Sequence, residues 1–259
     1  EENMRRLTTL SNTLLGGACA TYQRAGRGLI SSLGLWCSAA NATPRAADAP
    51  TGSSGLICSD LLARDDESLH VLRNLQSSSY ARTDPNVSQF GLQTCVGRIV
   101  RLGGRALGAL CVLYREDYGP SDEDDRLLGI VASALAVEER RLRAEQRQAV
   151  AYGIADAASK SAGLHDLGCF IHQELRRLIE AKNFYLALDD KENRQIVFPY
   201  YVDENIPSGV GRPARPYANG LTEYVIRGGQ AVILDENDIR SRVRAGTLQI
   251  IGILPRVWL

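Results

Sequence analysis

The sequence lacks an excess of charge of either sign. Lysine and arginine together number 30 and aspartate and glutamate together number 30, so the formal net charge of the 259 residues is zero. Nucleic acids and anionic membranes attract basic surfaces, and a balanced chain gives no electrostatic reason to expect either. We therefore expect no nucleic acid and no membrane contact among the partners of this chain.

Long apolar runs and a leader segment are also missing. The longest apolar runs, residues 129–137 and 108–114, are far shorter than the about 20 residues that a membrane span needs. No basic segment followed by an apolar stretch opens the chain, so no signal peptide is predicted. The chain begins at Glu1 without a methionine, as an excised fragment of a longer protein would.

The chain has few cysteines and no CxxC pair. The six are Cys19, Cys37, Cys58, Cys95, Cys111 and Cys169. Scattered thiols in a chain of this length are typical of reduced cytoplasmic proteins, so we expect a cytoplasmic location and no disulfide framework. A glycine-rich phosphate loop, a Ser/His/Asp constellation, catalytically spaced carboxylates and a kinase ATP-binding sequence are all missing. We predict a regulatory chain that is not an enzyme, and any kinase activity would lie outside it.

The clearest pattern that is present is a long helix in the middle of the chain. Ser121 is a candidate N-cap, and the four residues that follow it are all carboxylates, which the helix dipole favours in the first turn. We predict one continuous helix over residues 121–159 that joins two domains. Gly153 is its expected weak point, because glycine inside a helix costs about 1 kcal/mol relative to alanine.

Apolar residues recur along this helix with the three-and-four spacing of a coiled coil. They are Leu128, Val131, Leu135, Leu142 and Ala149, and Glu138 and Glu145 interrupt the series. The helix could pack on its own domain, or it could pair with a second copy of the chain. A helix of about 58 Å is longer than either domain needs. We therefore predict a modest parallel homodimer contact, with the two glutamates in its seam.

A β-hairpin is predicted directly before the long helix. Residues 96–102 and 105–114 flank Gly103-Gly104, a pair suited to the positive φ angles of a type I′ turn. A short helix is predicted after Asp84-Pro85, with the proline in its first position. Further strands are predicted at residues 18–24, 28–35 and 68–74, and a surface loop at residues 38–55.

The pattern starts again after the long helix. The predicted elements are an amphipathic helix at 165–180, strands at 183–189 and 195–202, a helix at 220–227 and a strand at 230–234. The order of elements is similar in both halves, which indicates an internal duplication. The expected organisation is a first domain at residues 1–120, a connecting helix at 121–159 and a second domain at 160–259.

The first half resembles a known family. Asn-Leu-Gln at 74–76, Tyr-Ala-Arg-Thr-Asp-Pro-Asn-Val at 80–87 and Phe-Gly-Leu-Gln-Thr-Cys-Val-Gly at 90–97 occur in order, and the run at 108–114 precedes Pro-Ser-Asp-Glu-Asp at 120–124. Over residues 3–145 these motifs resemble a GAF domain of bacterial sensor histidine kinases. Residues 166–259 resemble a second GAF domain, through the runs at 181–185 and 220–226.

The resemblance implies an α+β fold. Each of two GAF-like domains would be an antiparallel sheet with flanking helices, and the long helix would join them. Residues 255–259 look like the beginning of a fifth strand, so the second domain is expected to be truncated at its C-terminus. The family implies a sensory module of a signal-transduction protein, such as a two-component system, with a small-molecule ligand of unknown identity. The cofactor stays unknown, because the fold does not choose among cyclic nucleotides, haem, bilins and metabolites.

A ligand of the first domain is expected between its sheet and residues 58–84. The residues predicted to surround it are Trp36, Cys58, Asn74, Tyr80, Phe90 and Thr94, which offer aromatic walls with a few polar groups. The alternative is that these side chains simply close a core. A third possibility for the whole chain is a dimerisation scaffold without any ligand.

Thiol chemistry is the competing functional hypothesis. Cys58 lies where a loop enters a predicted helix, and the helix dipole can lower the pKa of a thiol there. A low pKa and a second thiol facing Cys58 would suit a redox enzyme like the GAF-type free methionine sulfoxide reductases. No cysteine motif of that family is found in this sequence, so a structural thiol is preferred.

Three further groups are weighed as ligands and set aside. His165, Cys169 and His172 share one helical face and could hold Zn²⁺ with one more ligand, but a core Cys169 flanked by histidines is preferred. His70 could bind haem, yet a lone strand histidine is more often hydrogen-bonded. The cyclic-nucleotide signature is not matched, and no cysteine has a neighbouring histidine for covalent bilin attachment.

Overall fold

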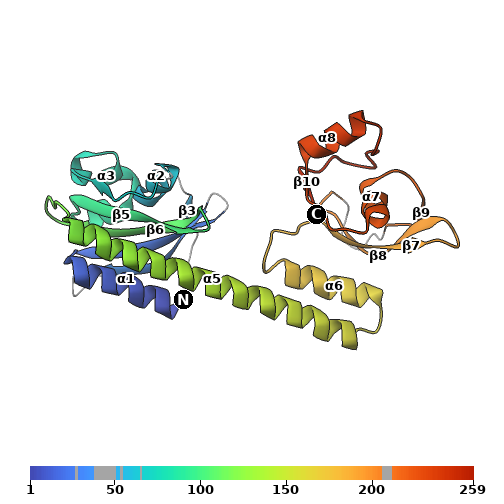
Figure 1. Cartoon of the computed structure of the whole chain (residues 1–259), viewed down its shortest axis with the longest axis horizontal. Coiled ribbons are helices and arrows are strands. Elements are labelled where there is room, and N and C mark those ends of the chain that lie inside the picture. The colour runs from blue at the N-terminus through green and yellow to red at the C-terminus, as the bar shows by residue number, and fades with distance from the viewer. Residues whose placement is uncertain (27–28, 38–50, 53–54, 65, 206–211) are drawn as a thin grey trace. The chain divides into compact units, whose positions relative to one another are not determined.

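The structure is a computed structural model that describes residues 1–26, 29–37, 51–52, 55–64, 66–205 and 212–259 (Figure 1). Of residues 25–26, 29–37 and 51–52 it describes the backbone only. The predicted loop at 38–55 therefore lies almost entirely outside the described residues. The chain divides into two compact units, Glu1–Glu145 and Gln146–Leu259. The fold is α+β with antiparallel sheets, as expected, and a long helix joins the two units.

The first unit is built on a six-stranded antiparallel sheet with strand order β3-β2-β1-β6-β5-β4. Its strands are β1 (Cys19–Gly26), β2 (Leu29–Cys37), β3 (Thr51–Gly52), β4 (His70–Leu72), β5 (Thr94–Leu102) and β6 (Arg105–Tyr114). Its shorter helices are α1 (Glu2–Leu15), α2 (Ile57–Arg64), η1 (Leu75–Ser77), α3 (Tyr80–Thr83) and α4 (Pro85–Phe90). The predicted hairpin is confirmed, because Gly103 and Gly104 adopt φ angles of 57° and 78° between β5 and β6.

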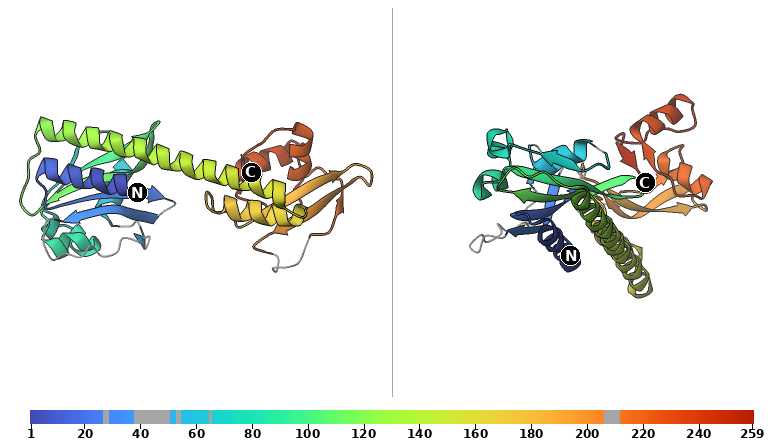
Figure 2. Two further views of the ribbon diagram at one scale, coloured as in Figure 1. Left: turned by 90° about the horizontal axis from the view of Figure 1, so that it is seen from below. Right: turned by 60° about the vertical axis from the view of Figure 1, so that its left-hand side comes forward.

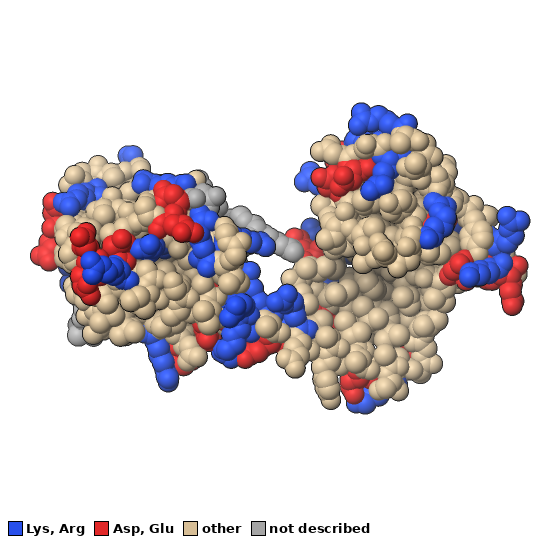
Figure 3. Space-filling view, in the orientation of Figure 1, with Lys and Arg blue, Asp and Glu red and all other residues tan. Residues whose placement is uncertain are grey.

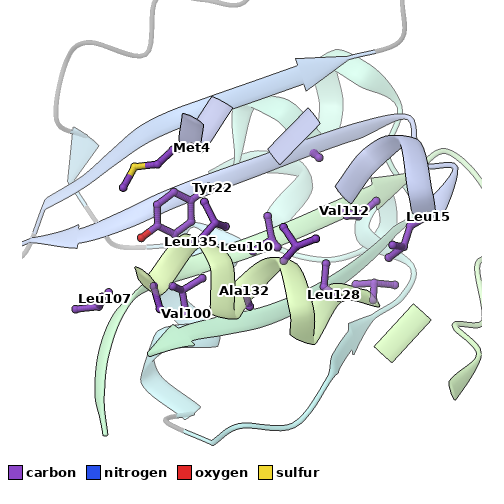
Figure 4. Packing of buried hydrophobic residues seen from close by; sticks show 14 of the residues in the cluster. Met4, Leu15, Tyr22, Val100, Leu107, Leu110, Val112, Leu128, Ala132 and Leu135 are labelled. Carbon is purple, nitrogen blue, oxygen red and sulfur yellow. The ribbon is translucent and has the colours of Figure 1, made fainter. Parts of the chain in front are cut away.

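The two faces of this sheet carry separate hydrophobic clusters. Helix α1 and the first part of the long helix α5 (Asp122–Lys160) cover one face, and α2 packs on the other (Figure 2). Side chains alternate along each strand, so that Ala20 and Tyr22 of β1 join the first cluster while Cys19 joins the second. Figure 4 shows Tyr22, Leu110 and Leu135 meeting between the sheet and the two helices.

Helix α5 begins with the predicted cap. The Ser121 backbone N–H donates to Asp124 Oδ2 at 2.7 Å, and the Asp124 N–H donates to Ser121 Oγ at 3.2 Å. The two residues satisfy each other's unpaired donors in a capping box. The prediction of a continuous helix is confirmed, but the helix does not break at Gly153. A Cβ there would be 3.7 Å from Phe170 and 3.6 Å from Glu174, so this glycine lies in ordinary packing contact with a neighbouring helix.

The apolar stripe of α5 is covered by the chain's own sheet. Leu128, Val131 and Leu135 are at most 3% exposed and belong to the cluster shared with α1 and the strands. This part of the stripe therefore packs on its own domain, which is the first of the two arrangements considered for the helix. Within the chain, Glu138 contacts Asn3 and Arg141, and Glu145 also pairs with Arg141.

The second unit has smaller sheets. Strands β7 (Phe184–Asp190), β8 (Gln195–Val202) and β9 (Arg215–Pro216) form one antiparallel sheet, and β10 (Leu234–Asp235) pairs with β11 (Val257–Trp258). Its helices are α6 (Leu164–Leu175), α7 (Leu221–Gly228) and α8 (Glu236–Arg244), besides the end of α5. The strand predicted at 230–234 is wrong except for its last residue. The short strand expected within 255–259 is present as β11.

Helix α6 lies close to β8 because of one glycine. A Cβ on Gly168 would be 2.5 Å from the Cβ of Tyr200, a distance that real side chains do not reach. The absence of a side chain at this position therefore permits the close helix–strand approach.

Charge is mixed on the surface. Figure 3 shows Lys and Arg interspersed with Asp and Glu on the visible face of each unit. Among the described residues, no helix is both long and apolar enough to span a membrane.

Candidate functional site

Three of the six predicted ligand-contacting residues meet in the first unit. Cys58 at the start of α2 and Phe90 at the end of α4 are 2% and 9% exposed and share the cluster between the sheet and α2. Tyr80 packs against that cluster, and its hydroxyl donates to Asp60 Oδ2 at 2.6 Å. Burial and this hydrogen bond raise the pKa of Tyr80 to about 12. Cys58 and Phe90 therefore belong to one hydrophobic cluster, and Tyr80 packs at its side.

The other three residues lie elsewhere. Asn74 is exposed and adopts a left-handed φ of 57° before η1. Thr94 is buried next to the strand position of Cys95, and the alternation of β5 turns it to the opposite face of the sheet. Its Oγ1 donates to the carbonyl of Glu116 at 2.9 Å. The backbone of Trp36 in β2 pairs with that of Ala20 in β1. The side chain of Trp36 is not among those that the structure describes.

Four cysteines of the first unit gather on one face of its sheet. Cys19, Cys95 and Cys111 come from three adjacent strands, and Cys58 lies above them on α2. The Sγ atoms of Cys58 and Cys111 are 3.5 Å apart. In the sequence these thiols are scattered. They come together only in the fold, because β1 pairs with β6 although the two strands are about ninety residues apart. Strand parity was the available signal, since Cys95, Gly97 and Cys111 are on one face in the β5–β6 register.

The low pKa that the redox-enzyme alternative requires of Cys58 is not found. The hydrogen bond with Cys111 raises the pKa of the Cys58 thiol, and complete burial and nearby Asp84 raise it further. For Cys111, the bond with Cys58 lowers the pKa, but contact with Cys95 and burial outweigh this and raise it. Cys58 does lie at the beginning of α2 as predicted, but desolvation of the thiolate overrides the helix dipole.

A small cavity of about 10 Å³ lies beside these thiols. Cys58 and Cys111 line it together with Thr21, Gln23 and Asp84. Thr21 Oγ1 and Gln23 Oε1 are buried there and have no hydrogen-bond partner among the described residues. The space is of the order that one water molecule needs, about 10–15 Å³. The described side chains around it leave no room for a metabolite at this position.

The second unit contains a much larger pocket, which we call the aromatic–arginine pocket. Its volume is about 790 Å³, within the range of about 300–1,000 Å³ typical of small-molecule sites. The residues that define it here are Tyr185, Phe198, Tyr201, Arg212 and Thr222. Sequence reasoning missed it, because its walls come from β7, β8, α7 and the last residues of the chain.

A guanidinium lies over two aromatic faces in this pocket. Arg212 Cζ is 5.1 Å from the ring centroid of Phe198 and 5.0 Å from that of Tyr201. Its Nη1 also donates to the Tyr201 hydroxyl oxygen at 2.8 Å. Burial raises the pKa of Tyr201 even though the positive charge of Arg212 opposes the shift. The phenol therefore stays neutral at physiological pH, and the pocket offers planar apolar faces next to a permanent cation.

Arg215, which lines the same pocket, forms an ion pair with Glu223. Arg215 Nη2 donates to Glu223 Oε2 at 3.0 Å, the other guanidinium nitrogen reaches Glu223 Oε1, and the Ala218 N–H donates to Oε1 at 3.0 Å. Burial alone would raise the pKa of Glu223, but Arg215 and the backbone N–H hold it below its usual value. The pair ties β9 to α7. Tyr185 adds a hydroxyl contact with Thr222 at 2.9 Å.

The histidines considered as metal or haem ligands have other partners. His172 Nδ1 contacts the Tyr200 hydroxyl at 2.9 Å, and its Nε2 contacts the Ala181 carbonyl at 2.7 Å. His172 is buried and Cys169 is only half-buried, the reverse of the predicted arrangement. His70 of β4 lies 3.1 Å from Asp66. Within the described ranges, no group of three His, Cys, Asp or Glu residues is placed to hold a metal.

No protein-family model and no curated protein matches the chain. Solved structures do match. A domain described as that of a two-component sensor histidine kinase protein from Sinorhizobium meliloti 1021 is 15% identical with a TM-score of 0.45, over 57% of this chain and 96% of that one. The chromophore-binding domain of a bacteriophytochrome from R. palustris is 11% identical with a TM-score of 0.44, over 55% of each chain.

A GAF domain from A. aeolicus is 10% identical with a TM-score of 0.40, over 52% of this chain and 82% of that one. The chain thus spans about half the length of the bacteriophytochrome domain that it matches. The solved structures to which this chain is similar include GAF-domain and sensor proteins, the class that its sequence motifs resemble.

Proposed function

We propose that the chain is a sensory module of a signal-transduction protein and that its second unit binds a small planar anion. The observation that carries the proposal is the aromatic–arginine pocket, with its volume of about 790 Å³ and its guanidinium over two rings. The GAF-like motifs of the sequence support the sensory role. The proposal moves the ligand from the first unit, where the sequence suggested it, because the cavity beside Cys58 among the described residues is only of water size.

The lining indicates the chemistry of the ligand. Aromatic faces of Tyr185, Phe198 and Tyr201 favour a flat ring system, since offset stacking adds about 0.5–1.5 kcal/mol to simple burial. Arg212 presents a planar fork of donors that matches a carboxylate or phosphate. Asn183 and Thr222 add neutral polar groups. An aromatic carboxylate or an aromatic phosphate satisfies these features together.

Helix α5 is the proposed route of the signal. In the first unit it is held by Glu139, whose Oε1 accepts hydrogen bonds from the Tyr22 hydroxyl at 3.0 Å and from Arg24 Nε at 2.6 Å. In the second unit its residue Val150 is 6% exposed, and Gly153 lies beside α6. A helix that is part of the packing of both units can respond when a ligand favours one arrangement of the pocket.

Native mass spectrometry of the whole chain tests this proposal. A panel of aromatic carboxylates and phosphates is added, with indole-3-acetate as one anion and indole-3-acetamide as its neutral match. We expect a one-to-one complex with at least one anion of the panel and weaker binding of the matched amide. Arg212→Ala should lower the affinity at least tenfold, about 1.4 kcal/mol, because it removes the cation.

Arg240→Ala is the matched control. Arg240 is an exposed arginine of the same unit that pairs with Glu236 on α8, outside the pocket lining. Its removal should leave binding unchanged. The proposal is wrong if no member of the panel binds, or if Arg212→Ala and Arg240→Ala bind equally well.

The proposed role is regulatory and not catalytic. The redox-enzyme alternative required both a second thiol facing Cys58 and a low thiol pKa. Cys111 supplies the first condition at 3.5 Å, while the pKa of Cys58 is raised and not lowered. Thiolate, not thiol, is the attacking form, so rapid turnover of methionine sulfoxide is not expected from this site.

We also propose that pairing of two copies along α5 uses a different stripe from the one predicted. Ile130, Val137 and Tyr152 are 67%, 55% and 75% exposed, whereas Leu128, Val131 and Leu135 are covered. Sedimentation at micromolar concentration checks this. A dimer that Ile130→Ser with Val137→Ser disrupts supports it, and a strict monomer contradicts it.

A further inference from the structure

The thiols of the first unit are an independent feature that the proposed ligand site does not use. Cys58 and Cys111 belong to segments separated by 53 residues, yet their sulfur atoms are 3.5 Å apart. Both residues are at most 2% exposed and lie in the cluster between α2 and the sheet. A buried pair of this kind is either an inert packing contact or a site of oxidation.

We propose that Cys58 and Cys111 form a reversible disulfide when a hydroperoxide enters the cavity beside them. The bond would join α2 to β6 and so fasten the helix to the sheet. The proposal concerns a modification site in the first unit, and its outcome does not depend on ligand binding in the second.

The geometry requires only a short movement. A disulfide has an S–S distance of about 2.05 Å, so the two sulfur atoms must approach by about 1.5 Å. Gly97 permits the close approach of these groups, because a Cβ at this position would lie 3.2 Å from Cys111 Sγ and 2.5 Å from Leu61 on α2. The glycine therefore keeps α2 close to the sheet without a side chain between the helix and Cys111.

The cavity suits a small polar oxidant. Its volume of about 10 Å³ is at the lower limit of what one water molecule needs, so the cavity must widen to admit hydrogen peroxide, which has a second oxygen atom. Thr21 Oγ1 and Gln23 Oε1 are buried without a hydrogen-bond partner among the described residues, and both residues line the cavity. These two oxygens can accept hydrogen bonds from the two O–H groups of hydrogen peroxide. A bulkier oxidant has no comparable space there.

The reaction balances with hydrogen peroxide as the oxidant. The raised pKa of Cys111 keeps most of this thiol protonated, so the reaction is slow. The small thiolate fraction attacks one peroxide oxygen, the O–O bond breaks, and the leaving hydroxide takes up the proton that Cys111 released and becomes water. The Cys58 sulfur then attacks the sulfenic sulfur of Cys111, its thiol proton joins the departing hydroxyl, and a second water forms. Two thiols are oxidised by two electrons, and one peroxide is reduced to two waters.

Peptide mapping of the intact chain after hydrogen peroxide treatment tests the proposal. We expect a mass lower by two hydrogen atoms, reversed by dithiothreitol. After the remaining thiols are blocked and the chain is cut at arginine, the peptide that ends at Arg64 should be joined to the peptide that ends at Arg115. The melting temperature should be higher in the oxidised chain, because a cross-link restricts the unfolded state.

Variants separate this bond from its alternatives. Cys58→Ser should abolish the cross-link, while Cys169→Ser, a half-buried thiol of the second unit, should leave it intact. If Cys58→Ser fails to fold, the mapping of the unmodified sequence still decides. The proposal is overturned if Cys111 is joined to the Cys95 peptide instead, or if these cysteines only gain oxygen atoms or remain reduced.

Discussion

In the first unit, helices cover both faces of a six-stranded sheet, and the space beside the central strands is reduced to a cavity of about 10 Å³. In the second unit, the sheet of β7, β8 and β9 opens onto a pocket of about 790 Å³. Most of the fully buried apolar side chains of the described residues belong to the first unit. The two halves repeat a similar order of elements, yet among the described residues the large pocket lies in the second unit.

A similar order of helices and strands in the two units therefore does not determine where a ligand binds. Cysteines and small strand residues let α2 approach the first sheet, and Gly97 is the clearest example. In the second unit, bulky Tyr185, Phe198 and Tyr201 project from the sheet, and an arginine covers two of their rings. Close packing in one unit and aromatic walls in the other therefore suit a structural and a binding role.

The largest expected effect comes from creating a void in the first unit. Leu110 is fully buried between the sheet and the helices, so Leu110→Ala should lower the free energy of unfolding by about 2–5 kcal/mol. Denaturant unfolding measures it. The two tryptophans, Trp36 and Trp258, belong to different units, so Trp258→Phe makes fluorescence report the first unit alone.

The control for that prediction is Leu14→Ala, whose side chain is 46% exposed on α1 of the first unit, which the same fluorescence reports. Its effect should stay within about 0.5 kcal/mol. A loss below about 1 kcal/mol for Leu110→Ala would mean that the first unit is not closely packed, and the comparison between the units would fail.

The next effect concerns acid stability of the second unit. The folded pKa of Glu223 is depressed, so its carboxylate contributes stability above the unfolded pKa of about 4.3, and this is lost as pH falls through the folded pKa. Glu223→Gln should cost about 3 kcal/mol at pH 7, since it leaves Arg215 without its charge partner. Unfolding followed by Trp258 fluorescence in a Trp36→Phe background measures it.

At pH 3 the difference between Glu223→Gln and the unmodified chain should shrink, because protonation then neutralises the carboxylate as the substitution does. Glu236→Gln is the control, since Glu236 pairs with Arg240 at the surface. An equal loss at both pH values would show that the carboxylate charge does not hold β9 to α7.

The smallest expected effect concerns the N-terminal cap of the helix that joins the units. Ser121→Ala removes one side of the capping box and should lower the stability of the first unit by about 1 kcal/mol. Ser133→Ala, at an exposed position within the same helix, should cost nothing, because alanine favours helix. Equal effects in the Trp258→Phe background would contradict the assigned helix start.

Local features of the fold could be predicted from the sequence. The Gly103-Gly104 turn, the Ser121 cap and the strand at 195–202 follow from residues close in sequence, where turn and capping chemistry decide the structure. The sites could not be predicted, because they depend on distant pairings. Cys58 meets Cys111 only after β1, β5 and β6 align, and Thr94 was placed on the wrong face because the β5 register was not considered.

Hydrogen exchange with and without the tightest-binding anion of the panel tests the central claim most directly. The account predicts slower exchange around the aromatic–arginine pocket, in β7, β8 and the beginning of α7. It predicts no change in β1 and β6 beside the small cavity of the first unit. Protection of β1 and β6, with none in β7 and β8, would place the ligand in the first unit and contradict the account.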